Sequence, residues 1–275
     1  MGDGKVRRSD RLVCLTQLFL QNPHTAVSLS DLAERLGAAK SSLSEDLSIV
    51  RAVFEQQGLG TFETATGAAG GIRYIPGVSE AFAVDFVRRL QGELADGERI
   101  LPGGFLFMSD ILGRPDVLDA AGRLFAHRFA GAGAEVVMTV ETKGIPLAVS
   151  TARYLGLPIV VVRRNQRLTE GSAVSLNYVS GSDRRIQTMS LSRRSLREGS
   201  RALIVDDFMK AGGTARALVE LLAEFGGEAV GIGVFTATLE PEKKLVSEYV
   251  SLVDIGRMDE EKRRVETVRG TYFGR

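Results

Sequence analysis

Residues 205–214 combine neighbouring carboxylates with a lysine and a glycine-rich turn. The segment reads Val-Asp-Asp-Phe-Met-Lys-Ala-Gly-Gly-Thr. The neighbouring carboxylates of Asp206 and Asp207 can accept hydrogen bonds from two vicinal hydroxyls, and they can equally bind Mg²⁺. The stretch from Lys210 to Thr214 can turn successive backbone N–H groups toward an anion, because its two glycines tolerate a positive φ and a helix follows. A sugar diol beside a terminal phosphate describes ribose 5-phosphate. The alternative is an ordinary strand-to-helix turn with a capping acid.

The pattern around this segment predicts a strand, a loop, a helix and a second strand. Residues 202–205 are apolar and predict a buried strand, residues 216–225 place apolar side chains on one helical stripe, and residues 228–235 form another apolar run. Ligands of open α/β sheets bind at the carboxyl ends of the strands. The candidate site is therefore expected at that edge of a parallel sheet.

Two further strand ends belong to the same expected sheet. Residues 135–140 predict a strand followed by the turn 142–144, and residues 159–162 predict a strand that ends in Arg163 and Arg164. Between residues 165 and 192 a long, polar, serine-rich stretch predicts an extended β-ribbon around a turn. Residues 163–201 hold nine arginines and three acidic residues, a net +6 in a chain of net charge +1. These arginines can neutralise a bound anion, contact DNA phosphates or stay solvated, and the sequence does not choose among them.

The first 75 residues predict a winged helix. Ser28 and Asp31 form a capping box for a helix that Gly37 ends, and residues 38–54 repeat the helical period. Two short helices joined by a glycine turn are typical of a helix-turn-helix, whose second helix enters the DNA major groove. Residues 60–64 and 71–75 predict a hairpin wing, with Arg73 reaching the minor groove. The residues expected to contact DNA are Lys5, Arg7, Arg8, Lys40, Ser41, Ser42, Ser44, Arg51 and Arg73.

The charge of this module leaves an alternative open. Residues 1–75 contain eight Lys or Arg and eight Asp or Glu, whereas DNA-binding domains are usually basic. A winged helix that serves as a protein-interaction or dimerisation module is therefore the competing interpretation.

The acidic, glycine-rich segment carries a family resemblance. It resembles the phosphoribosyl pyrophosphate (PRPP) motif of type I phosphoribosyltransferases, and its form Asp-Asp-Phe-Met-Lys-Ala-Gly-Gly-Thr is similar to the purine operon repressors of Gram-positive bacteria. The resemblance implies an α/β protein: an N-terminal winged helix, that is a helix-turn-helix plus a β wing, followed by a type I phosphoribosyltransferase fold with a mostly parallel sheet. The expected domains are residues 1–75, which bind DNA, and residues 76–275, which bind the effector, with Pro76 and Gly77 as the join.

The resemblance also assigns roles to the loops. It makes residues 142–144 the pyrophosphate loop, Arg163 and Arg164 its cationic partners, and the ribbon a mobile flap over PRPP. The segment before the first sheet strand is similar to the hood over the base, where Phe105 either stacks on a purine ring or packs in the core. The residues expected to bind PRPP or a related nucleotide are Asp206, Asp207, Phe208, Met209, Lys210, Ala211, Gly212, Gly213, Thr214, Thr142, Lys143, Gly144, Arg163, Arg164, Ser175, Tyr178 and Phe105.

Composition sets further limits. The chain has 275 residues, 44% of them hydrophobic, which suits one α/β domain plus a small module. Its one cysteine, Cys14, excludes an intrachain disulfide and is expected in the core of an apolar helix; it favours the cytoplasm. Secretion and membrane spanning are not expected, because no apolar run of sufficient length occurs. Two histidines and no Cys/His cluster predict neither a metal site nor histidine-based catalysis.

Two hypotheses of different classes follow. In the first, the phosphoribosyltransferase domain is a non-catalytic sensor: a homodimer represses purine genes by binding double-stranded operator DNA, PRPP releases it, and guanosine tetraphosphate competes for the same loop. No cofactor is obligatory, and the sequence leaves open whether Mg²⁺ accompanies PRPP. In the second, the chain is an active purine phosphoribosyltransferase with an accessory N-terminal domain, since nothing in the motif forbids catalysis. A protein- or ribosome-binding module with a vestigial fold is the third.

Overall fold

The structure is a computed structural model that describes residues 6–65, 70–103, 105–164, 172–179 and 186–274. The chain divides into two compact units. The first comprises Met1–Glu80 and Arg153–Gly156, and the second comprises Ala81–Ala152 and Leu157–Arg275. The domain boundary expected between residues 75 and 76 falls on the last residues of a strand of the first unit.

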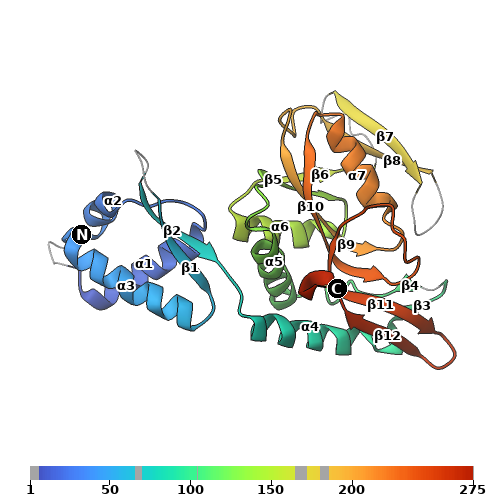
Figure 1. The fold of residues 1–275 in the computed structure, drawn as a ribbon, viewed down its shortest axis with the longest axis horizontal. Helices are drawn as coiled ribbons and strands as arrows, with labels where there is room; N and C mark the ends of the chain where they lie inside the picture. Colours follow the sequence, from blue (N-terminus) through green and yellow to red (C-terminus); the bar gives the residue numbers. More distant parts are fainter. Residues whose placement is uncertain (1–5, 66–69, 104, 165–171, 180–185, 275) are drawn as a thin grey trace. The chain divides into compact units, whose positions relative to one another are not determined.

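The first unit contains three helices and a two-stranded antiparallel sheet (Figure 1). Ser28 accepts a hydrogen bond from the backbone N–H of Asp31 at 3.0 Å, and Gly37 ends the same helix at φ +56°, so the predicted cap and stop are both confirmed. The strands pair from Gly60–Pro76 to Ala65–Gly71, which confirms the predicted hairpin. The elements are α1 (Arg8–Gln21), α2 (Leu29–Leu36), α3 (Lys40–Gln56), β1 (Gly60–Ala65) and β2 (Gly71–Pro76).

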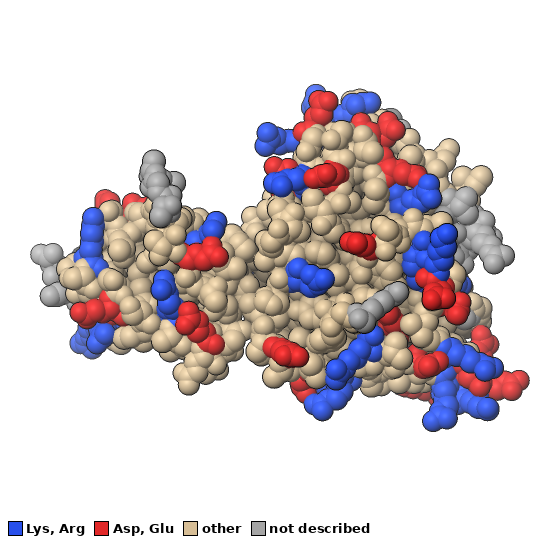
Figure 2. All heavy atoms as spheres, viewed as in Figure 1, with Lys and Arg blue, Asp and Glu red and all other residues tan. Residues whose placement is uncertain are grey.

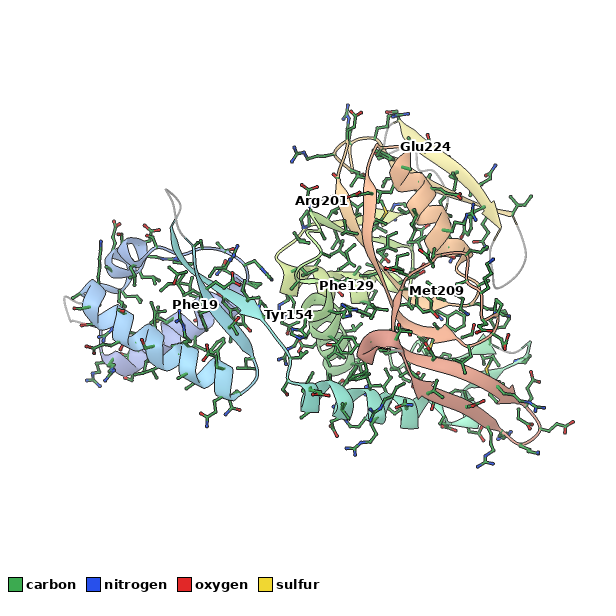
Figure 3. All side chains as sticks on the ribbon, viewed as in Figure 1. Phe19, Phe129, Tyr154, Arg201, Met209 and Glu224 are labelled. Atoms are coloured by element: carbon green, nitrogen blue, oxygen red, sulfur yellow. The ribbon has the colours of Figure 1, made fainter. Side chains whose placement is uncertain are left out.

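Aromatic rings fill the centre of this unit. Phe19 of α1 points into this centre (Figure 3). Phe62 of β1 meets Phe19 edge to face, with ring centroids 5.0 Å apart, and the centroid of Phe62 lies 5.2 Å from that of Phe54 of α3. Leu15 and Phe19, four residues apart, form the buried stripe of α1. The expectation that Cys14 packs in the core is wrong, because the residue is exposed. Successive residues of a helix are rotated by about 100°, so Cys14 points away from the stripe that its neighbour Leu15 belongs to.

A buried ion cluster joins α1 to α3. The Asp46 carboxylate, 1% exposed, accepts from Arg11 Nε at 2.7 Å and from Arg8 Nε at 3.0 Å. The Arg11 side chain is 9% exposed, and its Nη1 also donates to the carbonyl oxygen of Val6 at 3.0 Å. Because Asp46 and Arg11 are buried and their desolvation is offset only by their partners, the cluster fixes the start of α1 against the middle of α3; Arg8, 56% exposed, closes the cluster toward the solvent.

Replacing Asp46 by Ala is expected to destabilise the first unit by about 3 kcal/mol, because Arg11 is left as a buried charge without its carboxylate. Urea unfolding of the full chain, with hydrogen exchange of the α1 and α3 amides to localise the loss, measures the effect. The matched control is Glu45→Ala on the exposed side of α3, with an expected change within about 0.5 kcal/mol. Equal losses in the two variants contradict the role given to the cluster.

The second unit is built on a six-stranded sheet. Its strand order is β12 (Arg264–Arg269), β11 (Val250–Asp259), β10 (Glu228–Thr238), β9 (Arg201–Met209), β5 (Val136–Val140) and β6 (Ile159–Val162). All neighbours are parallel except the edge pair β11 and β12, so the predicted mostly parallel sheet is confirmed. The strand expected over residues 202–205 extends four residues further, so Asp206 and Asp207 lie within β9 and not after it.

Helices cover both faces of this sheet. α7 (Gly213–Ala223) packs against β9 and β10 on one face, while α5 (Pro115–Phe129) lies on the other, where its Phe125 and Phe129 rings fill the space beside Gly231 and Gly233 of β10. α6 (Gly144–Leu155) follows β5. The remaining elements are α4 (Glu80–Leu94), β3 (Ile100–Leu101), β4 (Phe105–Leu106), the antiparallel pair β7 (Ala173–Val179) and β8 (Ile186–Ser192), and the 3₁₀ turns Gly97–Arg99 and Thr271–Phe273.

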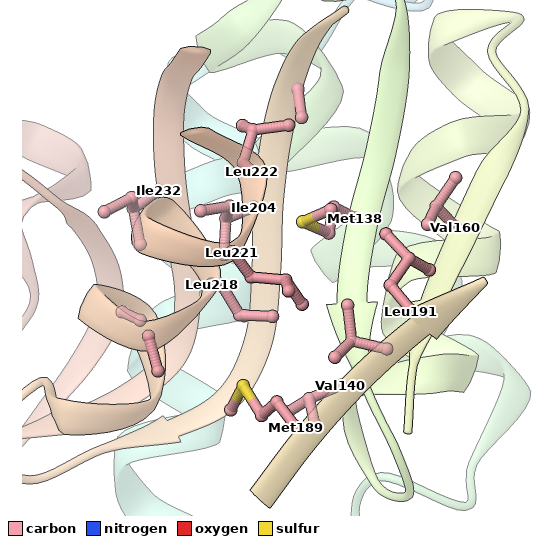
Figure 4. Packing of buried hydrophobic residues seen from close by; sticks show 14 of the residues in the cluster. Met138, Val140, Val160, Met189, Leu191, Ile204, Leu218, Leu221, Leu222 and Ile232 are labelled. Atoms are coloured by element: carbon pink, nitrogen blue, oxygen red, sulfur yellow. The ribbon is translucent and has the colours of Figure 1, made fainter. Parts of the chain in front are cut away.

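The main core lies between α7, the sheet and the β7–β8 ribbon. Figure 4 shows Leu218 and Leu221 of α7 facing Ile204 of β9 and Met138 of β5, with Met189 of β8 closing the other end. The strand of a parallel sheet is apolar on both faces because helices cover it, which is why β5 is buried along its whole length. Among the described helices, none combines the length and the hydropathy that a membrane span needs.

Candidate functional site

Three loops meet at the carboxyl edge of the sheet. They follow β5, β6 and β9, which are neighbours with Val140 opposite Val162 and Met138 opposite Ile204. A Cβ atom on Gly144 would lie 2.9 Å from Asp206 Oδ1 and 2.4 Å from Thr139 Oγ1. The turn after β5 and the acidic end of β9 therefore touch, and only glycine fits between them.

One member of the acidic pair, Asp206, is buried, and Asp207 is half-buried. Asp206 is 6% exposed, and its Oδ1 accepts the backbone N–H of Asp207 at 2.9 Å. Burial raises the pKa of Asp206 well above its usual range, the charge of Asp207 adds to the rise, and the Arg164 guanidinium partly opposes it. A group that brings hydroxyl donors or positive charge to this edge relieves the electrostatic cost of ionising Asp206.

The loop after β9 forms a small cradle at the start of α7. Gly212 has φ +84° and is the N-cap residue of the helix, so the first N–H groups of α7 have no partner within the helix. Together with the positive end of the helix dipole, these groups suit a phosphate monoester. The pocket is lined by Asp206, Phe208, Met209, Lys210, Ala211, Gly212, Gly213, Thr214, Ala215 and Val234.

Glu141 binds both arginines that follow β6. It was not among the residues predicted from the sequence. Its carboxylate accepts from Arg163 Nη1 at 3.3 Å and from the backbone N–H of Arg164 at 2.7 Å. Arg164 Nη1 also donates to Gln187 Oε1 of β8 at 3.1 Å. The available signal was its position: Glu141 directly follows β5 and precedes the turn 142–144.

Some predicted ligand-binding residues are not brought into this crevice. Tyr178, 8% exposed, belongs to the main core and donates its hydroxyl to Gln187 Oε1 at 2.8 Å, because β7 turns Val174, Leu176 and Tyr178 to its buried side. Ser175 lies on the exposed side of the same strand. Met209 is different: it is 3% exposed and packs in the core at the end of β9 (Figure 3), and it also lines the pocket of the cradle. Thr142 and Lys143 are exposed on the turn that reaches the crevice, and Phe105 on β4 is 47% exposed.

The predicted DNA-contacting residues fall into two groups. Lys40 is the first residue of α3, and on the same helix Ser41 and Ser44 are exposed while Ser42 and Arg51 are half-buried. Arg7 is exposed before α1, and Lys5 lies outside the described residues. The second group consists of arginines that form ion pairs within the unit. Arg8 pairs with Asp46, and Arg73 Nη2 donates to Glu63 Oε2 at 2.7 Å. Figure 2 shows basic and acidic side chains intermingled on the visible face of this unit.

Comparisons with known proteins match both units. The model of the bacterial purine repressor N-terminal domain matches residues 7–76, and that of the phosphoribosyl transferase domain matches residues 108–263. The purine biosynthesis transcriptional repressor PurR of Bacillus subtilis is 51% identical over 269 residues, which cover 98% of this chain and 94% of that protein. The chain belongs to the PurR family. The resemblance read from the acidic segment is thereby confirmed.

Other PurR family members differ in the direction of regulation that their names give. A probable regulator from Streptococcus pneumoniae is 43% identical over 270 residues, covering 98% of both chains. A purine biosynthesis transcriptional activator from Lactococcus lactis is 39% identical over 268 residues, covering 98% of this chain and 99% of that one. Among solved structures, an adenine phosphoribosyltransferase from Thermoanaerobacter pseudethanolicus shares the fold, with a TM-score of 0.53 and 22% identity over 60% of this chain and 98% of that one.

Replacing Asp206 by Asn is expected to stabilise the ligand-free protein at neutral pH by about 1 kcal/mol. Because its pKa is raised in the folded state, the wild-type protein loses stability as the pH rises from the ordinary aspartate pKa through the raised one; the variant lacks this loss. Thermal unfolding between about pH 5 and about pH 8 measures the difference. Asp116→Asn, at a side chain that is 68% exposed, is the control. A wild-type stability that does not fall relative to Asp206→Asn over this range speaks against the assignment.

Proposed function

We propose that the chain is a transcriptional repressor of purine biosynthesis and salvage genes, that it binds operator DNA as a homodimer through the first unit, and that PRPP bound in the second unit releases it. One combination carries the proposal: an aspartate pair with one buried member, beside a helix start that a glycine opens, in the same chain as a helix-turn-helix with a β wing. The phosphoribosyltransferase fold then serves as a sensor and not as an enzyme.

The crevice offers a matching group for each part of PRPP. The ribose hydroxyls donate to Asp206 and Asp207, the 5-phosphate lies on the N–H groups of residues 211–214, and the diphosphate lies between the turn 142–144 and Arg163. These groups support the proposal because the three loops share one edge of the sheet. Among the described residues there is no group of three or more His, Cys, Asp or Glu side chains that could hold a metal ion.

The first unit supplies the DNA contact. Lys40 at the start of α3 and the hydroxyls of Ser41 and Ser44 meet the major groove, where small side chains allow close approach to base edges and phosphates. A homodimer presents two such helices to two half-sites.

Regulation requires that PRPP favour one arrangement of the dimer over the DNA-bound one, since a ligand shifts an equilibrium only by its differential affinity. Guanosine tetraphosphate, which also carries a ribose and diphosphates, competes for the same loops. It therefore opposes the release that PRPP causes.

Retained catalysis is the second candidate, and the intact acidic pair and cradle favour it. Such an enzyme positions the ribose and the departing diphosphate by the same contacts. Incubating the full chain with PRPP and xanthine, guanine or hypoxanthine tests this candidate. Appreciable nucleotide formation would contradict the non-catalytic sensor and support an active enzyme. The direction of regulation is tested separately, by transcription from a purine promoter in the presence of the protein.

The central test is a crossed pair of variants in an operator titration with and without PRPP. Asp207→Ala is expected to keep operator affinity while raising the PRPP concentration needed for release by about 10- to 100-fold, because it removes a charged hydrogen-bond acceptor. Lys40→Glu is expected to weaken operator binding by at least about tenfold while leaving PRPP affinity unchanged. Calorimetry measures PRPP binding, and fluorescence anisotropy of labelled operator DNA measures release. Unchanged release from Asp207→Ala contradicts the effector site, and unchanged DNA affinity of Lys40→Glu contradicts the recognition helix.

A further inference from the structure

The segment between β10 and β11 binds the backbone of the cradle, the loop of residues 210–214. We call residues 239–249 the strap; they return the chain from the carboxyl end of β10 to the start of β11. Lys244 Nζ on the strap lies 2.6 Å from the carbonyl oxygen of Lys210 and 2.6 Å from that of Thr238. One residue further, the N–H of Leu245 donates to the carbonyl oxygen of Ala211 at 2.8 Å. Two consecutive carbonyls of the cradle are thus bound by two consecutive residues of the strap.

The Lys244 ammonium group donates to carbonyl groups that lie beyond the paired part of the sheet. β9 and β10 are parallel neighbours that end together, with Ala237 opposite Met209, and the carbonyl groups that follow the last ladder pair have lost their strand partners. An ammonium group has three donors and a full positive charge. Besides the two carbonyls, Lys244 reaches Thr238 Oγ1 at 3.3 Å. It therefore ties the ends of both strands together.

Fixing these carbonyls also orients the cradle's donors. In a trans peptide unit the C=O and the N–H point in opposite directions. When the carbonyls of Lys210 and Ala211 point to the strap, the N–H groups of Ala211 and Gly212 point away from it, toward the pocket. The strap also lies close to the turn itself: a Cβ atom on Gly212 would be 3.3 Å from the nitrogen of Leu245 and 3.5 Å from Val246 Cγ2.

We propose that Lys244 is a positioning residue for the phosphate-binding loop: its ammonium group fixes the loop carbonyls and thereby aims the loop N–H groups at the terminal phosphate of a sugar phosphate. The inference rests on the proposed function, because it assumes that the crevice binds PRPP. It adds a residue that lies outside the acidic, glycine-rich motif and acts on the ligand only through the loop.

The test separates the two ends of the ligand. Calorimetry on the full chain measures the binding of ribose 5-phosphate, which needs the cradle, and of inorganic pyrophosphate, which needs the turn 142–144. Lys244→Met is expected to weaken ribose 5-phosphate binding by about tenfold and to leave pyrophosphate binding unchanged. Lys244→Arg, which keeps a charged donor, is expected to restore most of the affinity. Lys243→Met, at the exposed neighbouring residue of the strap, is the matched control.

Each outcome decides a different question. Wild-type affinity of Lys244→Met for ribose 5-phosphate overturns the inference, and so does an equal loss for both ligands, which indicates general damage. If Lys244→Met does not fold, Lys244→Gln takes its place, with a smaller loss confined to ribose 5-phosphate expected and an unchanged affinity counting against the inference. A wild-type protein that binds neither probe nor PRPP contradicts the proposed function itself.

Discussion

A carboxylate held out of water at the end of β9 constrains the whole crevice. Asp206 is buried beside a second aspartate, and its ionised form is correspondingly unfavourable. The neighbouring loop accommodates this carboxylate only because residue 144 has no side chain. The helix that follows β9 starts at a residue in the left-handed conformation. The buried carboxylate costs stability in the free protein when it ionises, and the proposed ligand, whose hydroxyls donate hydrogen bonds to the acidic pair, would offset that cost as it binds.

The elements that frame the crevice could be predicted from local sequence patterns. The strands expected over residues 159–162 and 228–235 appear as apolar runs. In the first unit, the helix cap at Ser28 and the helix end at Gly37 likewise depend only on local residues. The length of β9 could not be read in this way. Its backbone continues to pair with β10 through Asp206 and Phe208, although the apolar run stops before them. Pairing with a neighbour carries the strand past the point where its hydrophobic signal ends.

The roles of side chains that depend on partners far along the chain could not be predicted from the sequence either. Tyr178 was expected at the ligand, but strand alternation and the register with β8 place it in the core. Glu141 and Lys244 stand in no recognisable motif, and each acquires a role only when the fold brings it to arginines or carbonyl groups far along the chain. The motif therefore identifies the loop that we propose binds the phosphate, whereas the groups that hold this loop in place are brought to it by the topology.

The balanced charge of the first unit bears on how such a protein can be regulated. Arg8 and Arg11 are bound by Asp46, and Arg73 by Glu63, so several cations of this unit are already paired within it. Because phosphate neutralisation supplies much of the affinity for DNA, a DNA-binding unit in which basic and acidic residues are equal in number binds DNA more weakly than a strongly basic one. Coupling between two sites is typically about 1–3 kcal/mol, or about 5- to 150-fold in affinity. A coupling of that size cannot empty a very tightly occupied operator, but it is sufficient when affinity and protein concentration are closely matched. For the proposed sensor, the balanced charge would keep DNA occupancy within the range that an effector can change.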